Sequence, residues 1–291
     1  MTLKIASRSD ISPFIVMDVM RAANAREMVG QDVLHLEVGQ PSTPAPQSVI
    51  QTAKLMLDNN QLGYTDALGI PLLRDTLSNY YRDFYDLEIP KSRLVITTGS
   101  SGAFLLGFLA VFEHGDKVGL TSPGYPAYKN ILQAVGVDVI EIPVDADTDF
   151  QLNIDILRNL KVNLDGLIIA SPSNPTGSML SDIALKEICN WCSMQKVRLI
   201  SDEIYHGITF QIKATSALKY NKDAIIINSF SKYFSMTGWR LGWMIVPSDL
   251  IRTVECLAQN LFISPPTLSQ LAAVSVFECC DELNAYVERY A

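Results

Sequence analysis

Short apolar runs alternate with longer stretches of helical periodicity along most of this chain. Runs of this kind, bounded by glycine, proline and polar residues, are typical of buried strands. Alternation of strands with helical segments predicts an α/β fold, with a mostly parallel central sheet of about seven strands and helices on both faces. The expected strands cover residues 33–38, 94–97, 117–121, 138–142, 167–170, 198–201 and 224–227.

Helical spacing of apolar residues predicts the elements between the strands. An amino-terminal helix over residues 12–28 is expected outside the sheet, with Ser12 as its cap and Pro13 in its first turn. Further helices are expected over residues 48–58, from 71 onward, and over 103–112, 181–194, 250–260, 267–277 and 281–291. We therefore divide the chain into an amino-terminal helix and loop (1–47), a large domain (48–249) and the start of a carboxy-terminal region (250–291).

Charge and composition exclude several classes of partner. The 291 residues carry a net charge of −8, which disfavours nucleic acid and anionic membrane surfaces as partners. The longest apolar run, residues 103–112, is shorter than the roughly 20 residues of a membrane span. The polar start MTLKIASRSD has no apolar signal core, so a cytoplasmic location is expected. Cys189 and Cys192 lie inside a helical pattern with no second pair, and we expect inert thiols and no metal site.

Candidate chemistry begins after the apolar run 224–227, in the stretch SFSKYFSMTGWRLGW. Lys232 follows a strand at its carboxyl end, the edge of an α/β sheet where ligands bind. A lysine amine becomes a nucleophile when burial or a nearby cation lowers its pKa, and Arg240 could supply that cation. A surface lysine beside a turn is the alternative interpretation.

Other strand ends carry complementary chemistry. The turn TGSSG, residues 98–102, leads from a strand into a helix and predicts an anion-binding cradle with Ser100 and Ser101 as donors. It matches neither a dinucleotide-binding motif nor a nucleoside-triphosphate loop. Tyr125 is held between glycine and proline, which suits stacking on a flat ring, and Asp202 at another strand end would need a cationic partner.

Ser229-x-Ser231-Lys232 followed by GWRLGW resembles the lysine signature of the class I/II aminotransferases, enzymes of pyridoxal-phosphate fold type I. The resemblance implies that Lys232 forms a Schiff base with the cofactor pyridoxal 5′-phosphate. It also implies catalytic roles for Lys232, Asp202 and Tyr205. The cofactor-binding residues that it implies are Ser100, Ser101, Tyr125, Asn174, Asp202, Tyr205, Ser229, Ser231, Lys232 and Arg240, with Tyr64 reaching in from a partner subunit.

The resemblance implies that Asp202 pairs with the ring nitrogen of the cofactor, and that Asn174 and Tyr205 donate hydrogen bonds to its phenolic oxygen. The backbone of Gly39 and the side chain of Asn174 would contact the substrate. The role of Tyr64 implies a homodimer with shared sites. Glu203 is expected to be structural.

The expected activity is the transfer of an amino group between an amino acid and a 2-oxo acid, with Lys232 moving the α-proton. The sequence does not indicate which side chain is accepted. A β-lyase or a synthase of the same fold would share the cofactor residues, and a non-catalytic cofactor-binding domain is a further alternative. Because family members continue into a smaller domain that carries a carboxylate-binding arginine, we expect a truncated enzyme with impaired turnover.

Overall fold

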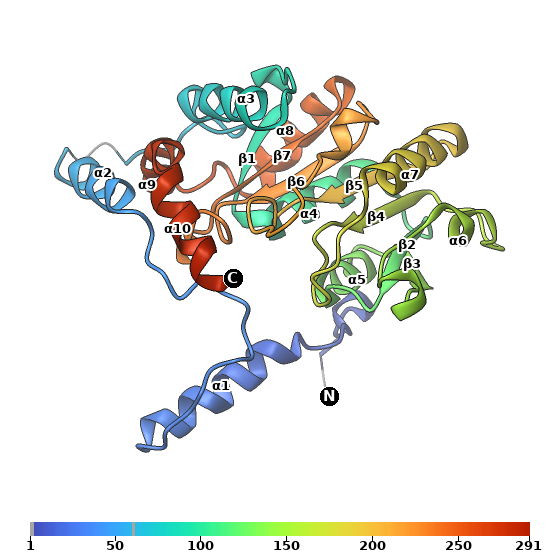
Figure 1. Cartoon of the computed structure of the whole chain (residues 1–291), viewed down its shortest axis with the longest axis horizontal. Helices are drawn as coiled ribbons and strands as arrows, with labels where there is room; N and C mark the ends of the chain where they lie inside the picture. Colours follow the sequence, from blue (N-terminus) through green and yellow to red (C-terminus); the bar gives the residue numbers. More distant parts are fainter. Residues whose placement is uncertain (1–2, 60–61) are drawn as a thin grey trace.

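The computed structural model describes residues 3–59 and 62–291, and its centre is a seven-stranded sheet (Figure 1). The strands are β1 (Leu94–Thr97), β2 (Lys117–Ser122), β3 (Asp138–Pro143), β4 (Gly166–Ala170), β5 (Arg198–Asp202), β6 (Ile225–Ser229) and β7 (Gly242–Ile245). Their order across the sheet is β1-β7-β6-β5-β4-β2-β3. Strands β2 to β6 pair in parallel, whereas β7 runs antiparallel between β6 and β1. The mostly parallel α/β fold is therefore confirmed.

Helices cover both faces of this sheet, except α1, which lies apart from it. The helices are α1 (Ile15–Met28), α2 (Gln47–Asp58), α3 (Pro71–Tyr85), α4 (Gly99–Val111), α5 (Pro126–Ala134), α6 (Ile154–Arg158), α7 (Asp182–Gln195), α8 (Ile251–Leu261), α9 (Thr267–Ala273) and α10 (Cys280–Tyr290). Side chains of α4, α5 and α8 form one buried apolar cluster, and those of α2, α3, α6, α7, α9 and α10 form the other. Strand β6 contributes to both, because Ile225 and Ile227 face the first cluster and Ile226 faces the second.

The prediction of a strand over residues 33–38 is wrong. This segment forms no strand, and the side chains of Leu34 and Leu36 are 84% and 91% exposed. The seventh strand is instead β7, where Trp243 and Met244 are fully buried between β1 and β6. An alternating apolar pattern predicts a strand only where a neighbouring strand can pair with it, and no described strand lies beside residues 33–38.

Several helix boundaries also differ from the prediction. Helix α1 begins after Phe14 instead of Ser12, and α4 begins at Gly99, inside the turn expected to precede it. The helix predicted over 267–277 is α9 followed by a 3₁₀ helix, Val274–Glu278. Helices α5 and α6 were not predicted, since each is short and follows closely on other elements.

Helix α1 projects away from the rest of the molecule and has no buried residue (Figure 1). The segment before it lies against α5, where Asn130 Nδ2 donates to the carbonyl of Ser12 at 3.2 Å. Within residues 3–59 and 62–291, no helix is both long enough and apolar enough to cross a membrane.

Candidate active site

Lys232 lies in the loop that follows β6, and its side chain is half-buried. Its Nζ donates to the carbonyl of Gly39 and lies 5.6 Å from the centre of the Tyr205 ring. Burial lowers the pKa of this amine, and the nearby Arg240 guanidinium lowers it further, although Asp202 acts in the opposite direction. The amine is therefore more readily deprotonated than that of an exposed lysine, as expected from the sequence.

One cavity of about 130 Å³ brings most of the predicted site residues together. Its lining includes Ser100, Ser101, Tyr125, Asn174, Asp202, Tyr205, Ser231, Lys232 and Arg240. These residues come from the loops after β1, β2, β4, β5 and β6, which end at the same edge of the sheet. Residues scattered over the sequence meet here because parallel strands present their carboxyl ends together.

The first turn of α4 forms the cationic end of this cavity. Gly99 has a φ of +67°, and a side chain there would collide with Arg240, since an added Cβ would lie 2.5 Å from its Nη2. Arg240 Nη1 also donates to the carbonyl of Thr237 at 3.1 Å, which fixes the guanidinium beside the helix start. Free backbone N–H groups, two serine hydroxyls and a guanidinium make this end suited to a phosphate dianion.

Asp202 forms the acidic part of the cavity and is buried. Tyr128 donates its hydroxyl to Asp202 Oδ2, and the backbone N–H of Ile204 donates to Oδ1 at 3.1 Å. Burial raises the pKa of Asp202 to about 6, and these hydrogen bonds limit the rise. Tyr128 belongs to no motif in the sequence, although it lies three residues after Tyr125, at the start of α5.

Asn174 and Tyr205 lie together on the cavity wall. Asn174 Nδ2 donates to Tyr205 Oη at 3.3 Å, and burial raises the pKa of the Tyr205 hydroxyl to about 12. Tyr205 is therefore a neutral donor near neutral pH. The two side chains can offer hydrogen bonds to a common oxygen acceptor.

Three predicted residues lie outside the lining of this cavity. The Ser229 hydroxyl is buried and donates towards Ser231 Oγ at 2.9 Å and the carbonyl of Leu241 at 3.1 Å. Gly39 is at the mouth, where it contacts Lys232, and the side chain of Tyr64 is 85% exposed. The structure thus places Ser229 behind Ser231, and Tyr64 on the surface of this chain.

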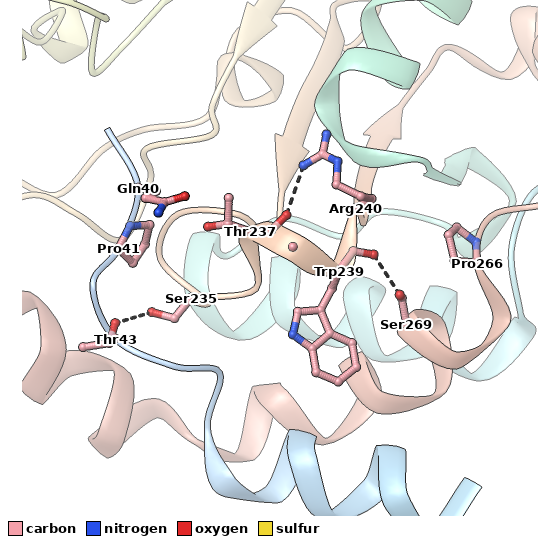
Figure 2. Close-up of a pocket in the computed structure, with 10 residues that line it drawn as sticks. Gln40, Pro41, Thr43, Ser235, Thr237, Trp239, Arg240, Pro266 and Ser269 are labelled. Atoms are coloured by element: carbon pink, nitrogen blue, oxygen red, sulfur yellow. Dashed lines mark hydrogen bonds between the residues drawn. The ribbon is translucent and has the colours of Figure 1, made fainter. Parts of the chain in front are cut away.

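A second, larger cavity of about 610 Å³ is lined in part by Thr237 and Arg240, which also line the first (Figure 2). Figure 2 shows Thr43 and Ser235 side by side in its lining, and their hydroxyls are 2.8 Å apart. Both side chains are buried, so this contact joins the loop after Gly39 to the loop that carries Lys232. No motif in the sequence marks these two residues, because their partnership depends on the fold alone.

Cys189 and Cys192 are buried, and burial raises the pKa of both thiols, that of Cys189 to about 12. Such thiols are poor nucleophiles and poor metal ligands. Among residues 3–59 and 62–291, no group of three or more His, Cys, Asp or Glu side chains is arranged to hold a metal ion.

Comparison with known proteins agrees with this geometry. The model of the family "Aminotransferase class I and II" matches residues 31–291. A valine–pyruvate aminotransferase from Mycobacterium tuberculosis is 47% identical, over 100% of this chain and 76% of the relative. A crystal structure of an aminotransferase from the same organism superposes with a TM-score of 0.97 at 46% identity, covering 100% of this chain and 76% of the other.

A more distant structure has the same fold. Aspartate aminotransferase from Thermus thermophilus with maleate superposes with a TM-score of 0.94 at 25% identity, over 99% of this chain and 76% of that one. Because the family model covers most of the chain, and a relative at 47% identity is covered over three quarters of its length, the match is not confined to the lysine motif. The chain belongs to the class I and II aminotransferases.

Proposed function

We propose that this aminotransferase holds pyridoxal 5′-phosphate, the cofactor of its family, in the 130 Å³ cavity through the amine of Lys232. The observation that carries the proposal is the convergence of Lys232, Asp202 and Arg240 on one cavity, although they come from separate parts of the chain. The amine is the group that can bind an aldehyde covalently. The carboxylate and the guanidinium supply the charges that the two ends of such a cofactor require.

The donor set supports this assignment. Ser100, Ser101, Ser231 and Arg240 would hold the phosphate beside the first turn of α4, and Ser229 would support them through Ser231. Tyr125 would lie against the ring. Asn174 and Tyr205 would donate to the phenolic oxygen, and Asp202 would pair with the ring nitrogen. A buried carboxylate with a raised pKa is stabilised by a cationic partner, which explains why Asp202 lies there.

Lys232 is the proton carrier in the proposed reaction. Its lowered pKa would allow the neutral amine to take the α-proton of the substrate and deliver it to the aldehyde carbon of the cofactor. The carbonyl of Gly39 accepts a hydrogen bond from the amine and orients it at the cavity mouth. When bound, the cofactor ring supplies an electron sink for the pair left behind when that proton departs.

The proposed substrates are an amino acid and a 2-oxo acid, exchanged in two half-reactions at the same site. We place the backbone of Gly39 and the side chain of Asn174 at the substrate. The name of the M. tuberculosis relative makes valine and pyruvate the first pair to assay. Product analysis separates this reaction from those of a β-lyase or a synthase, which would release products other than a new amino acid and 2-oxo acid.

We further propose a homodimer in which Tyr64 reaches the partner's cofactor. Its side chain is 85% exposed on its own chain, and α1 has no buried residue. An exposed aromatic side chain and an unsupported helix both gain burial when a second copy is present.

The test of the cofactor assignment is an absorbance spectrum of the purified chain with added pyridoxal phosphate. We expect a visible band that is absent in Lys232→Ala, and transfer of the amino group from valine to pyruvate only in the wild type. Lys219→Ala, which removes an exposed lysine paired with Asp182, serves as the control and should keep the band. An equally strong band in Lys232→Ala would refute the assignment. A band without any turnover would favour a non-catalytic cofactor-binding domain.

A further inference from the structure

Glu203, next to Asp202, is a fully buried carboxyl group that the reaction does not use. Its Oε1 accepts three hydrogen bonds, from Ser216 Oγ at 3.0 Å, the backbone N–H of Ala217 at 2.9 Å and Ser201 Oγ at 3.2 Å. Its Oε2 has no hydrogen-bond partner in the described part of the chain and lies 3.6 Å from His206 Nδ1. A buried oxygen without a partner is costly, so its place beside a histidine requires an explanation.

His206 is equally buried, and its neighbours fix where its proton lies. Nε2 is 3.0 Å from the carbonyl of Ser171. A carbonyl only accepts, so Nε2 must carry the hydrogen. Nδ1, 2.8 Å from the Tyr85 hydroxyl, is then free to accept, provided that the ring is neutral.

The surroundings disfavour charge on both groups. Burial raises the pKa of Glu203 to about 8 and lowers that of His206 to about 4. The titratable groups that face Glu203 are Asp202 on its own segment, Cys189 on α7, and the tyrosines of α3 at positions 80, 81 and 85. Asp202 raises the pKa of Glu203 further, since two adjacent carboxylates repel one another. Near neutral pH, Glu203 therefore carries a proton, and the single lone pair of His206 Nδ1 accepts from the Tyr85 hydroxyl.

The pair lies directly behind the proposed cofactor site. His206 holds the carbonyl of Ser171, the first residue of the loop that carries Asn174, and the N–H of Ser171 points to the Asp202 carbonyl at 3.4 Å. Tyr205 precedes His206 in the chain and accepts from Asn174. The imidazole of His206 thus joins the loop after β4 to the turn after β5. The joined positions lie close to the site in sequence, since Ser171 is three residues before Asn174 and His206 directly follows Tyr205.

We propose that Glu203 and His206 are a positioning pair that holds one proton inside the protein, as carboxylic acid and neutral imidazole, and keeps Asn174 against Tyr205. A neutral acid costs less than a carboxylate at a buried oxygen that has no hydrogen-bond partner in the described part of the chain. Because Glu203 stays neutral, Asp202 remains the carboxylate available for the ring nitrogen. This inference rests on the proposed function, in which Asn174 and Tyr205 set the charge on the cofactor's phenolic oxygen.

The first test does not depend on the cofactor. The chain has only three histidines, so their ring signals can be followed by NMR in the purified full chain. The signals of His206 should stay fixed between about pH 5.5 and 8, with Nε2 protonated, whereas those of the exposed His35, whose pKa is raised by hydrogen bonds to Glu37 and Glu27, should move. The signals are assigned by His206→Gln, or by elimination with His35→Gln and His114→Gln if that variant does not fold. A doubly protonated His206 ring at neutral pH would show an ion pair and overturn the proposal.

The second test measures the pH midpoint of the absorbance change of the bound cofactor. Glu203→Gln keeps an oxygen for the three donors and turns an N–H₂ group towards Nδ1, so it mimics the neutral acid and should keep the wild-type midpoint. Glu203→Ala and His206→Ala should raise the midpoint by about one unit, because Asn174 and Tyr205 then stabilise the charged oxygen less well. His114→Ala, an exposed histidine, is the control.

A wild-type midpoint in His206→Ala would overturn the positioning role, as would a Glu203→Gln variant that behaves like Glu203→Ala. If no cofactor band forms in the wild type, the proposed function fails, while the NMR result still decides whether the pair is neutral.

Discussion

At the scale of single residues, the site depends on groups whose surroundings move their pKa values in opposite directions. Burial raises the pKa of Asp202 to about 6 and lowers that of Lys232. Both shifts favour the neutral form, and the charge of each group acts on the other in the opposite direction. A cationic ring beside Asp202 would favour its ionised form, and an amine that loses its proton easily suits Lys232 for proton transfer.

Removal of the Tyr128 hydroxyl should change the pH dependence of the reaction. This hydroxyl donates to Asp202 and lowers its pKa, so Tyr128→Phe should raise that pKa above about 6. Since Asp202 acts in its ionised form, the acidic limb of the pH–rate profile should move upward by about half to one unit. Tyr220→Phe is a matched control, because its hydroxyl donates to the exposed carboxylate of Asp182. An unmoved acidic limb in Tyr128→Phe would show that Asp202 does not control it.

Sequence reasoning found the residues that carry a motif and missed those defined only by contact. Lys232, Asp202, Asn174 and Arg240 follow apolar runs or belong to a recognisable signature, and the fold brings them to one cavity. Tyr128 carries no such mark, because only the helix turn shared with Tyr125 directs it to Asp202. Glu203 is expected from the sequence to be structural, and its contact with His206 depends on the turn after β5, whereas the contacts of His206 with Tyr85 and Ser171 depend on how α3 and β4 pack against that turn.

At the scale of elements, the cavity depends on how closely α4 approaches the end of β7. Gly242, the first residue of β7, permits this approach. An added Cβ there would lie 2.8 Å from the backbone carbon of Gly99 and 2.9 Å from both Asn228 O and Ser100 N. The second glycine of the GWRLGW segment therefore fixes the place of the anion-binding helix start.

We expect Gly242→Ala to lower the free energy of unfolding by about 1–3 kcal/mol, because backbone atoms must move apart. The same movement should weaken binding of pyridoxal phosphate, since Ser100 lies in the displaced turn. Urea denaturation and a cofactor titration measure the two effects. Gly238→Ala is the control for stability, because nothing lies within 4 Å of an added Cβ there. Equal stability of the two variants would contradict this account of the close approach.

The sequence predicts an element correctly where a short apolar run is buried as a strand, and less well where the element depends on contacts with distant residues. Six of the expected strands are present, with ends that differ by no more than about two residues. The seventh was assigned to residues 33–38 instead of β7, because the apolar residues of both segments look alike until their partners are known. Helix α1 starts after Phe14, because the carbonyl of Ser12 is held by Asn130 of α5, and α4 starts at Gly99, inside the expected turn.

At the scale of the whole molecule, several apolar features lie exposed, and the proposed homodimer would cover them. Helix α1 projects from the body (Figure 1), and the side chains of Leu34 and Leu36, which follow it in the chain, are exposed. Tyr64 is exposed as well. The division into three regions and the impaired turnover expected from the sequence stay predictions.

Mixing two inactive variants tests whether the site is shared between subunits. Lys232→Ala and Tyr64→Ala should each lose most of the activity. A hybrid dimer of the two has one site with both an intact lysine and the partner's intact tyrosine, so refolding an equal mixture should restore activity. If Tyr64 instead acts within its own chain, every site in the mixture is defective and no activity returns. Native mass spectrometry of the mixture, with one variant isotopically labelled, confirms that hybrid dimers are present.

The antiparallel strand β7 also has a consequence for biosynthesis. Leu94 pairs with Ile245, so β1 has no described strand to pair with until the ribosome has made residues 242–245. The parallel strands from β2 to β6 can assemble earlier, while β1 and the serines that follow it remain unanchored. A nascent chain arrested before Gly242 should therefore be protease-sensitive around residues 94–101, and should gain resistance once residue 245 has emerged from the exit tunnel.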